Sequence, residues 1–281
     1  MGNFQVPCRR FALALLISVA ATQANSTTDC TKVVLTAPTE DGAAAWLLNG
    51  KLTGASIDFA EMVVQKAGIK EFEWKTYPTW QLALNAVITG EVDLIVELSK
   101  SYVRNQYLDF LPFPYSTSFT TIVVRAADQD ILTDLKSLTG RSGAFIEGVY
   151  IGERMFKKEL DLQIKPKQIS VLTSKEALAL VLDNRADFAV VPQLSFKQLA
   201  YQYNLSGALV VQNVYPSITD NYIAFSKRSL CSIATRKKFA QASQELKTGT
   251  EGFHRLLVKH QEIFNNEAGV LAQTDLLNPK R

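Results

Sequence analysis

Hydrophobic positions along the chain follow two alternating patterns, one typical of strands and the other of helices. Short β-branched and apolar runs predict buried strands, and apolar residues at every third or fourth position predict amphipathic helices. The two kinds of segment follow one another through most of the chain. Strands are predicted at residues 31–37, 72–76, 92–96, 120–124, 142–146, 186–191 and 222–226, and helices at residues 57–67, 80–89, 132–138, 150–160, 173–183, 232–247 and 252–264.

Local signals mark several helix ends. Thr79 can cap a helix that ends at Gly90, and Gly68 ends the helix before it. Thr173 and Glu176 form a capping box at the start of a later helix. Because strands and helices alternate in this way, we expect an α/β fold with mainly parallel sheets.

The strand–helix cycle restarts near the middle of the chain, which predicts two lobes. Lobe 1 is expected to be discontinuous, with residues 25–123 and 222–281, and lobe 2 to span residues 124–221. Extended crossings at residues 120–125 and 217–225 would then form a hinge beside a cleft. Even without its first 24 residues, the chain is long enough for two such units.

The N-terminal residues 1–24 have the pattern of a secretory signal peptide. Two arginines precede a short apolar run at residues 11–21, which is too short for a transmembrane helix. Small residues favour cleavage after Ala24, with Ala21 and Ser26 as alternative sites. No later stretch is apolar for long enough to span a bilayer. We therefore expect an exported, soluble, periplasmic protein.

Charge, cysteines and histidines narrow the function further. Removal of the leader lowers the formal charge from +3 to +1, which gives no electrostatic reason to bind nucleic acid or an anionic membrane. Cys30 and Cys231 remain, either as a disulfide in an oxidising compartment or as two free thiols. His254 and His260 lack companion ligands, so neither a metal site nor a cofactor is expected.

One arginine calls for an anionic partner. In the stretch VELSKSYVRNQYLDF (residues 96–110), Arg104 lies between the end of a buried strand and an apolar, proline-rich segment. Its planar guanidinium can pair bidentately with a carboxylate. A ligand carboxylate would fit this requirement, and pairing with Asp109 or with a backbone carbonyl is the structural alternative.

The surrounding segments resemble family 3 of the periplasmic solute-binding proteins, which have the type II binding-protein fold and include receptors for polar amino acids. GEVDLI (residues 90–95), SKSYVR (99–104) and YLDFLPFPY (107–115) match the central signature of that family. NGKLTGASIDFA (49–60) matches the preceding block, and LTDLKSLTGRSGAF (132–145) the start of the second lobe. The resemblance implies two α/β lobes, each with a mostly parallel sheet flanked by helices, joined by a two-crossing hinge.

The same resemblance implies roles for residues of the first lobe. Arg104 would grip the carboxylate of the ligand, Trp80 would form an aromatic wall, and Ser99 would lie beside the ligand. Core packing for Trp80 and a helix N-cap for Ser99 are the alternatives. Trp46 lies near the loop that supplies another aromatic residue in the family, although this loop lacks the family's proline-rich segment.

In the second lobe, Gly148, Val149 and Tyr150 form a strand-to-helix turn whose backbone amides can face an anion. Amino-acid receptors of the family place an aspartate for the ligand ammonium just after the strand at residues 186–191. This chain has Pro192 and Gln193 there, so a standard α-amino acid would lose a charge partner. Glu97, where relatives have a small residue, could take over the ammonium or could instead satisfy Arg104.

These features predict a non-catalytic, monomeric receptor that captures a small carboxylate-bearing, amino-acid-like ligand between two lobes. Closure around the ligand would then be recognised by the permease of an ABC importer. A sensor module that reports ligand to a membrane signalling protein is the alternative, because it uses the same fold. A lyase acting on a small carboxylate is a third possibility, with Glu97 as its acid or base.

Overall fold

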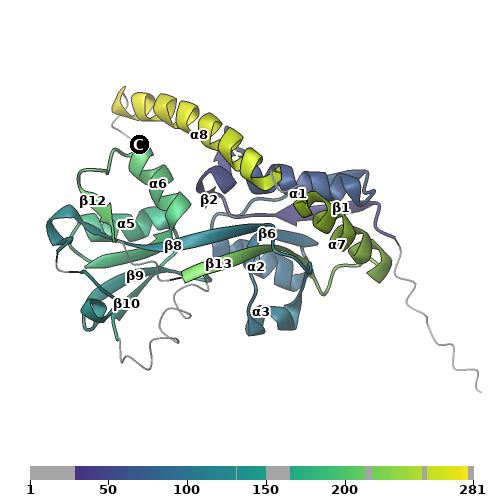
Figure 1. Ribbon diagram of the computed structural model, residues 1–281, viewed down its shortest axis with the longest axis horizontal. Coiled ribbons are helices and arrows are strands. Elements are labelled where there is room, and N and C mark those ends of the chain that lie inside the picture. Colours follow the sequence, from purple (N-terminus) through teal and green to yellow (C-terminus); the bar gives the residue numbers. More distant parts are fainter. Residues whose placement is uncertain (1–28, 131, 150–164, 213–216, 249–251, 278–281) are drawn as a thin grey trace, which may run out of the picture.

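The computed structural model describes residues 29–130, 132–149, 165–212, 217–248 and 252–277. Within these residues, ten strands form one sheet in which eight follow the order β10-β9-β11-β8-β13-β6-β1-β5, while β12 pairs with β8 and β7 with β13. Figure 1 shows helices on both faces of this sheet and two lobes along its length. The predicted signal peptide and Tyr150 lie outside the described residues. No helix among the described residues is long and apolar enough to cross a membrane.

Lobe 1 is built on three parallel strands, because β1 pairs with β5 on one side and with β6 on the other. The apolar positions of these strands and of α1 are buried in a common core that includes Leu35, Phe59 and Phe225. Thr79 accepts a hydrogen bond from the backbone of Leu82 at the start of α2, as predicted. The main elements of lobe 1 are β1 (Lys32–Thr36), α1 (Ala55–Lys66), β5 (Glu71–Trp74), α2 (Trp80–Thr89), β6 (Leu94–Ser99) and α7 (Ile233–Thr248).

Lobe 2 has its own parallel strands and its own core. β9 pairs in parallel with β10 and β11, and α5 and α6 pack beside them. The Thr173 hydroxyl accepts from the backbone N–H of Glu176, which confirms the predicted cap. The helix predicted at residues 132–138 is wrong: only η3 (Lys136–Leu138) forms, as a single 3-10 turn. The other elements are β9 (Ser142–Ile146), β10 (Lys167–Val171), α5 (Ser174–Leu182), β11 (Phe188–Pro192), α6 (Gln193–Gln202), β12 (Leu209–Val211) and η2 (Ala126–Asp128).

Two long antiparallel strands join the lobes. β8 (Ser116–Arg125) and β13 (Ser217–Ser226) pair with each other along their polar halves, from Ser217 opposite Thr120 to Asn221 opposite Ser116. The rest of β8 continues the sheet of lobe 2, and the rest of β13 continues that of lobe 1. The boundaries predicted from sequence, at residues 123/124 and 221/222, lie within the residue ranges of these two strands.

Small elements complete lobe 1 around the hinge. A three-stranded hairpin sheet follows β1 and lies beside the first residues of α6 in lobe 2. A short helix, α3, follows β6 and leads into β7, which pairs with β13. These elements are β2 (Glu40–Asp41), η1 (Gly42–Ala44), β3 (Ala45–Leu48), β4 (Lys51–Thr53), α3 (Tyr102–Tyr107) and β7 (Leu108–Phe110).

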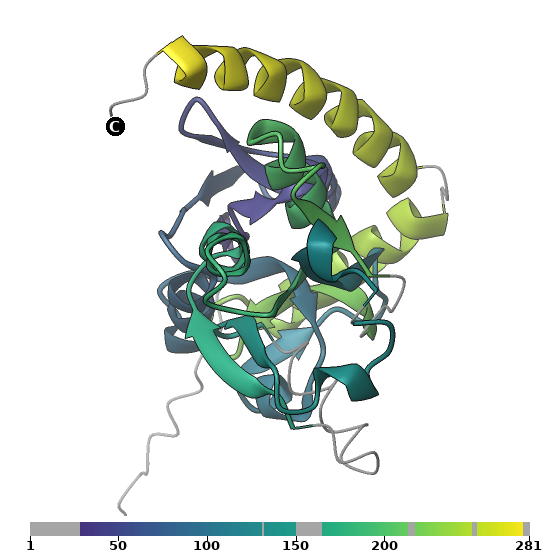
Figure 2. The same cartoon turned by 90° about the vertical axis from the view of Figure 1, so that its left-hand side faces the viewer.

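The last helix, α8 (Gly252–Leu277), extends well beyond the predicted residues 252–264 and reaches both lobes. It packs on α1 and η1 of lobe 1 and on α6 of lobe 2, and Figures 1 and 2 show it passing over them. Asp58 of α1 accepts from Lys259 Nζ at 2.9 Å and lies 2.7 Å from His260 Nε2. Asp58 therefore fixes α8 to lobe 1.

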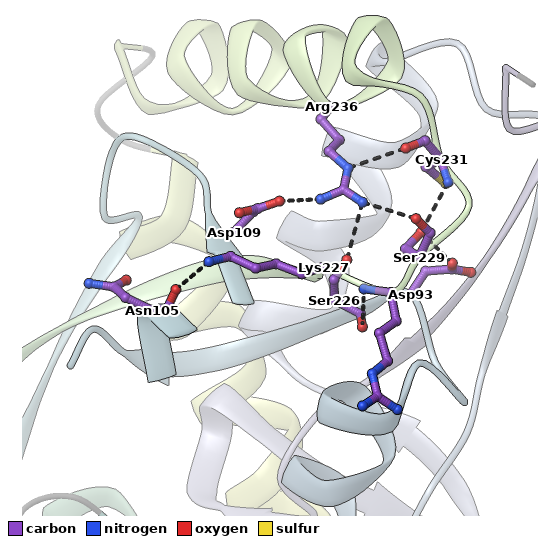
Figure 3. A network of polar contacts seen from close by, with 9 residues as sticks. Asp93, Asn105, Asp109, Ser226, Lys227, Ser229, Cys231 and Arg236 are labelled. Carbon is purple, nitrogen blue, oxygen red and sulfur yellow. Dashed lines mark hydrogen bonds and ion pairs between the residues drawn. The ribbon is translucent and has the colours of Figure 1, made fainter. Parts of the chain in front are cut away.

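The turn between β13 and α7 is tied to the rest of lobe 1. Cys30 and Cys231 form a disulfide. Arg236 of α7 pairs with Asp109 and donates to the backbone carbonyls of Ser226, Ser229 and Cys231 (Figure 3). All of these partners belong to lobe 1, so the arrangement stabilises that lobe.

Asp93, just before β6, belongs to the same region. It accepts from the Ser229 hydroxyl at 2.6 Å and from the backbone N–H of Val34 at 2.9 Å (Figure 3 shows the former). The carboxylate therefore joins β1 to the turn before α7, and its role is structural.

Candidate functional site

A cavity lies between the lobes beside the crossing strands and, with its mouth, holds about 860 Å³ of empty space. Lobe 1 contributes the loop after β1, the loop before α2, and residues of β6 and α3. Lobe 2 contributes the ends of β9 and β11 and the start of α5. The lining residues are Ala37, Pro38, Thr39, Glu40, Asp41, Tyr77, Pro78, Thr79, Trp80, Glu97, Ser99, Arg104, Ser118, Ile146, Val149, Leu172, Thr173, Ser174, Pro192, Thr219 and Asn221.

Arg104 reaches the cavity from the first turns of α3. The Ser101 hydroxyl caps this helix by accepting from the backbone N–H of Arg104 at 3.2 Å. The Nη1 atom donates to the carbonyl and the hydroxyl of Ser99, at 2.8 and 2.6 Å. The Nη2 atom donates across the cleft to the Gly148 carbonyl at 2.8 Å. Only 6% of this arginine is exposed, so its guanidinium bridges the two lobes in a buried position.

The Gly148 carbonyl is a second meeting point of the lobes. It also accepts from the indole Nε1 of Trp80, at 3.2 Å. Gly148 has φ +73°, and a Cβ there would come within 2.4 Å of the Gln81 side-chain oxygen. The flexible Gln81 side chain could move aside, so it is mainly the left-handed backbone conformation that favours glycine at this position.

Glu97 is the most unusual lining residue. Its backbone has φ +56°, a left-handed conformation that is uncommon for a residue other than glycine. Its carboxylate accepts from Tyr115 OH at 3.1 Å, from the Ser56 hydroxyl and from the Asn221 amide. In addition, its backbone N–H donates to Tyr115 OH at 3.0 Å. The side chain is thus held by neutral donors from three different parts of lobe 1 and the hinge.

Burial changes the proton affinity of two acidic residues in this cavity. Burial, with the nearby Asp41 charge as the second cause, raises the pKa of Glu97 to about 8. Burial also raises the pKa of Asp41 to about 6, although its hydrogen bond with Ser195 acts in the opposite direction. The two carboxyl groups therefore share a site in which both are hard to ionise at once.

The loop after β1 makes a further contact between the lobes. Ser195 of α6 donates its hydroxyl to the Glu40 carbonyl at 2.5 Å. Burial raises the pKa of the Glu40 carboxyl, while Lys175 and the backbone N–H of Ser174 act to lower it. Glu40 therefore lies at the N-terminus of α5, where the helix dipole favours a negative charge.

The structure brings together most of the site residues predicted from sequence. Arg104, Trp80, Ser99, Glu97 and Val149 line the cavity. The prediction that the turn at Gly148 presents free amides is wrong, because its carbonyl faces Arg104 and the N–H of Val149 donates to the Ile146 carbonyl. The lining also includes Pro192, at the place where amino-acid receptors were expected to have an aspartate.

Two other predicted residues lie apart from the lining. Gln193 begins α6 just behind Pro192, and is not a lining residue. Trp46 is only 3% exposed and makes edge contacts with His260 and Phe264 of α8. This position gives Trp46 a packing role between β3 and α8, because the last helix folds back over the hairpin.

Sequence reasoning missed Asp41, Glu40, Tyr77 and Asn221. Glu40 and Asp41 follow the carboxyl end of β1, and ligands of open α/β sheets bind beyond the carboxyl ends of strands, so this signal was available. Asn221 had no local signal. It reaches the site because β13 pairs with β6 in a register that sets Asn221 opposite Ser99.

The described residues contain no group of three or more His, Cys, Asp or Glu side chains that could hold a metal ion. The site instead combines one guanidinium, several carboxyl groups, hydroxyl groups and two aromatic side chains around a cavity that is open to solvent. Such a set of groups can orient a small polar ligand through hydrogen bonds and ion pairs.

Solved structures with the same fold come from transport receptors and from sensors. An amino acid ABC transporter substrate-binding protein, AbpA, from Streptococcus pneumoniae, bound to L-arginine, has a TM-score of 0.68 at 17% identity, over 83% of this chain and 96% of that one. A histidine kinase sensor domain has a TM-score of 0.68 at 18% identity, over 81% and 95%. The BvgS VFT2 domain of Bordetella pertussis has a TM-score of 0.65 at 17% identity, over 82% and 93%.

No curated protein sequence matches the chain. The model of the bacterial extracellular solute-binding proteins, family 3, matches residues 43–263, which is most of the chain. This match covers most of both lobes, the crossing strands and 16 of the 21 lining residues, and the other five, from Ala37 to Asp41, lie just before it. The chain therefore belongs to family 3 of the bacterial extracellular solute-binding proteins.

Proposed function

We propose that this protein is a periplasmic receptor that captures a small carboxylate-bearing, amino-acid-like ligand between its lobes and delivers it to an ABC importer, without chemical change. The observation that carries the proposal is Arg104, a buried guanidinium that lines the cavity and reaches from α3 to the opposite lobe. The similarity in fold to an amino acid ABC transporter protein bound to L-arginine supports it.

A carboxylate would bind Arg104 more strongly than its present carbonyl partners do. Two parallel N–H···O bonds to a charged carboxylate are shorter and stronger than bonds to neutral carbonyls. A ligand held in this way would lie beside Ser99 of lobe 1, and its other polar groups would face Thr173 and Ser174 of lobe 2 across the cavity. Contacts with both lobes favour the closed form, because an open form would lose one set of them.

A ligand sensor for a membrane signalling partner is the second candidate. The histidine kinase sensor domain and the BvgS VFT2 domain, which have the same fold, favour it. Uptake of labelled ligand that stops when the gene is deleted supports import. A ligand-dependent signalling response with normal uptake supports the sensor.

A thermal-shift screen of the purified mature protein tests the ligand class. The twenty amino acids, dicarboxylates, sugars and polyamines are the probes, and a hit at a hundredfold excess over its Kd should add about 2.7 kcal/mol of stability. Arg104→Ala should remove the response to a carboxylate hit. Arg185→Ala, at an exposed arginine outside the cavity, is the matched control and should keep it.

Two results would contradict the proposal. A carboxylate response that survives Arg104→Ala would remove this residue from the binding role. Conversion of the hit to a new product on incubation with the purified protein would show that the protein is an enzyme.

A further inference from the structure

The acidic lining residues of the cavity are all on one side. Glu40, Asp41 and Glu97 belong to lobe 1. Within the described part of lobe 2, the lining residues are Ile146, Val149, Leu172, Thr173, Ser174 and Pro192, and all are neutral.

We propose that Glu97 and Asp41, called here the carboxylate pair, bind a cationic group of the ligand on the lobe 1 side of the cavity. This inference rests on the proposed function and deepens it, because it names a second charge that the ligand must carry. The pair comes from two separate elements, β6 and β2, that face the same space.

The hydrogen bonds of the carboxylate pair orient it without neutralising it. Glu97 accepts from a serine, a tyrosine and an asparagine, and the hydroxyl of Ser195, which donates to the Glu40 carbonyl, lies beside Asp41. Neutral donors satisfy lone pairs, but a buried carboxylate also needs an opposite charge to offset its loss of water. An ammonium or guanidinium group of a ligand in this cavity would supply that charge.

The position of Arg104 leaves room for this arrangement. Its guanidinium donates to Ser99 and to the Gly148 carbonyl, so the positive fork points toward the turn of lobe 2. A ligand with a carboxylate at Arg104 and a cation at the carboxylate pair would meet both charges in one orientation. The site would then select zwitterionic and cationic solutes over dicarboxylates.

The proton affinities support the same assignment. Burial raises the pKa values of both members, and the nearby Asp41 charge raises that of Glu97 further, so the pair retains a proton near neutral pH. A cation that binds between them replaces this proton, and its affinity should therefore rise between pH 6 and 8. The groups that face the pair are Ser56, Tyr115, Asn221 and Ser195, and the other titratable lining residues are Glu40, Tyr77 and Arg104.

Calorimetry with four probes tests this proposal: L-arginine and L-glutamine carry both charges, agmatine carries only cations, and succinate only carboxylates. Glu97→Gln keeps the shape of the side chain. It should lower the affinity at least tenfold for each amino acid that binds the wild type. Asp41→Asn, on the hairpin, is a second variant in case Glu97→Gln does not fold. Glu73→Gln, at an exposed ion pair on β5, is the matched control and should change nothing.

The four probes separate failure of this proposal from failure of the proposed function. Binding of succinate alone, unchanged in Glu97→Gln, would overturn the cation site and leave the carboxylate site at Arg104 standing. Binding of agmatine but not of amino acids would support the carboxylate pair and contradict the proposed carboxylate-bearing ligand. A lack of response to all four probes and to the whole thermal-shift screen would overturn both.

The pH profile gives a readout that a merely structural role would not move. In the wild type, the affinity for amino acids should rise several-fold from pH 6 to pH 8. Binding should release a proton, so the measured binding enthalpy should depend on the ionisation enthalpy of the buffer. In Glu97→Gln, both the rise and the proton release should be much smaller. A wild-type affinity that is flat or falls over this range would contradict the proposal.

Discussion

Two arginines, Arg104 and Arg236, satisfy their guanidinium groups in similar ways and yet serve different purposes. Arg236 donates to three backbone carbonyls and pairs with Asp109, and all of these partners belong to lobe 1 (Figure 3). Arg104 also donates to backbone carbonyls, but one of them, at Gly148, belongs to lobe 2. An arginine inside one lobe stabilises that lobe, whereas an arginine across the cleft can exchange a partner for a ligand.

The disulfide beside Arg236 provides the strongest test of this distinction. Replacing Cys30 and Cys231 by serine removes a cross-link between residues 201 positions apart, and we expect a loss of roughly 2–5 kcal/mol of unfolding free energy. Ligand affinity should stay within twofold, because both cysteines lie outside the cavity. Urea unfolding and calorimetry measure the two quantities. A large change in affinity would mean that the Arg236 region is coupled to the cleft.

Arg236→Ala should have the next largest effect. The substitution leaves Asp109 and three carbonyls without this donor. Only 18% of the arginine side chain is exposed, so water replaces these bonds poorly. We expect a loss of roughly 1–3 kcal/mol, again without a change in ligand affinity. Lys227→Ala, which removes one exposed contact to the Asn105 carbonyl in the same region, is the control and should cost less than about 0.5 kcal/mol. Equal losses for both variants would contradict the structural role of Arg236.

Arg104→Lys should show the opposite profile. Lysine keeps the positive charge but lacks the planar fork, so we expect affinity for a carboxylate ligand to fall at least tenfold, or about 1.4 kcal/mol. The free energy of unfolding should change by no more than about 1 kcal/mol. Arg236→Lys, made in parallel, should lower stability and leave binding intact. If Arg104→Lys binds as the wild type does, the fork is not what holds the ligand.

The same contrast shows what the sequence could and could not reveal. Helix α2 was predicted with both ends because Thr79 and Gly90 lie at its boundaries and act locally. Arg104 was found because an arginine between apolar segments is conspicuous and because its surroundings resemble a known family. The roles of Asp109 and Gly148 could not be read in this way, since they depend on partners that the fold brings together from distant positions.

Long-range pairing explains the remaining misses. The polar first half of β8 has no hydrophobic pattern, and it is a strand only because it pairs with β13 about a hundred residues later. Asn221 enters the site because β13 also pairs with β6, which sets it opposite Ser99. Trp46 was expected near the ligand, but α8 folds back over the hairpin and covers it. No local signal in the sequence announces any of these contacts.

The last test concerns the pH dependence of stability, and it separates the cleft from the Arg236 region once more. Glu97 has a pKa of about 8 in the folded protein and an ordinary value near 4 when unfolded, so between these values the folded state binds more protons. Stability from this group is therefore complete at low pH and is lost as the pH rises toward 8. Asp41 contributes in the same direction over a narrower window, because its raised pKa is about 6.

Urea unfolding at several pH values between 5 and 8 measures this loss in the wild type, in Glu97→Gln and in Arg236→Ala. The unfolding free energy of Glu97→Gln should depend less on pH than that of the wild type. It should fall less between pH 5 and pH 8, because the amide does not ionise in the cavity. Arg236→Ala should lower the free energy of unfolding at every pH and keep the slope of the pH profile. None of the hydrogen bonds of Arg236 described above involves Glu97 or Asp41. Parallel curves for Glu97→Gln and the wild type would mean that Glu97 is ionised throughout, and that a positive group already present in the protein balances it.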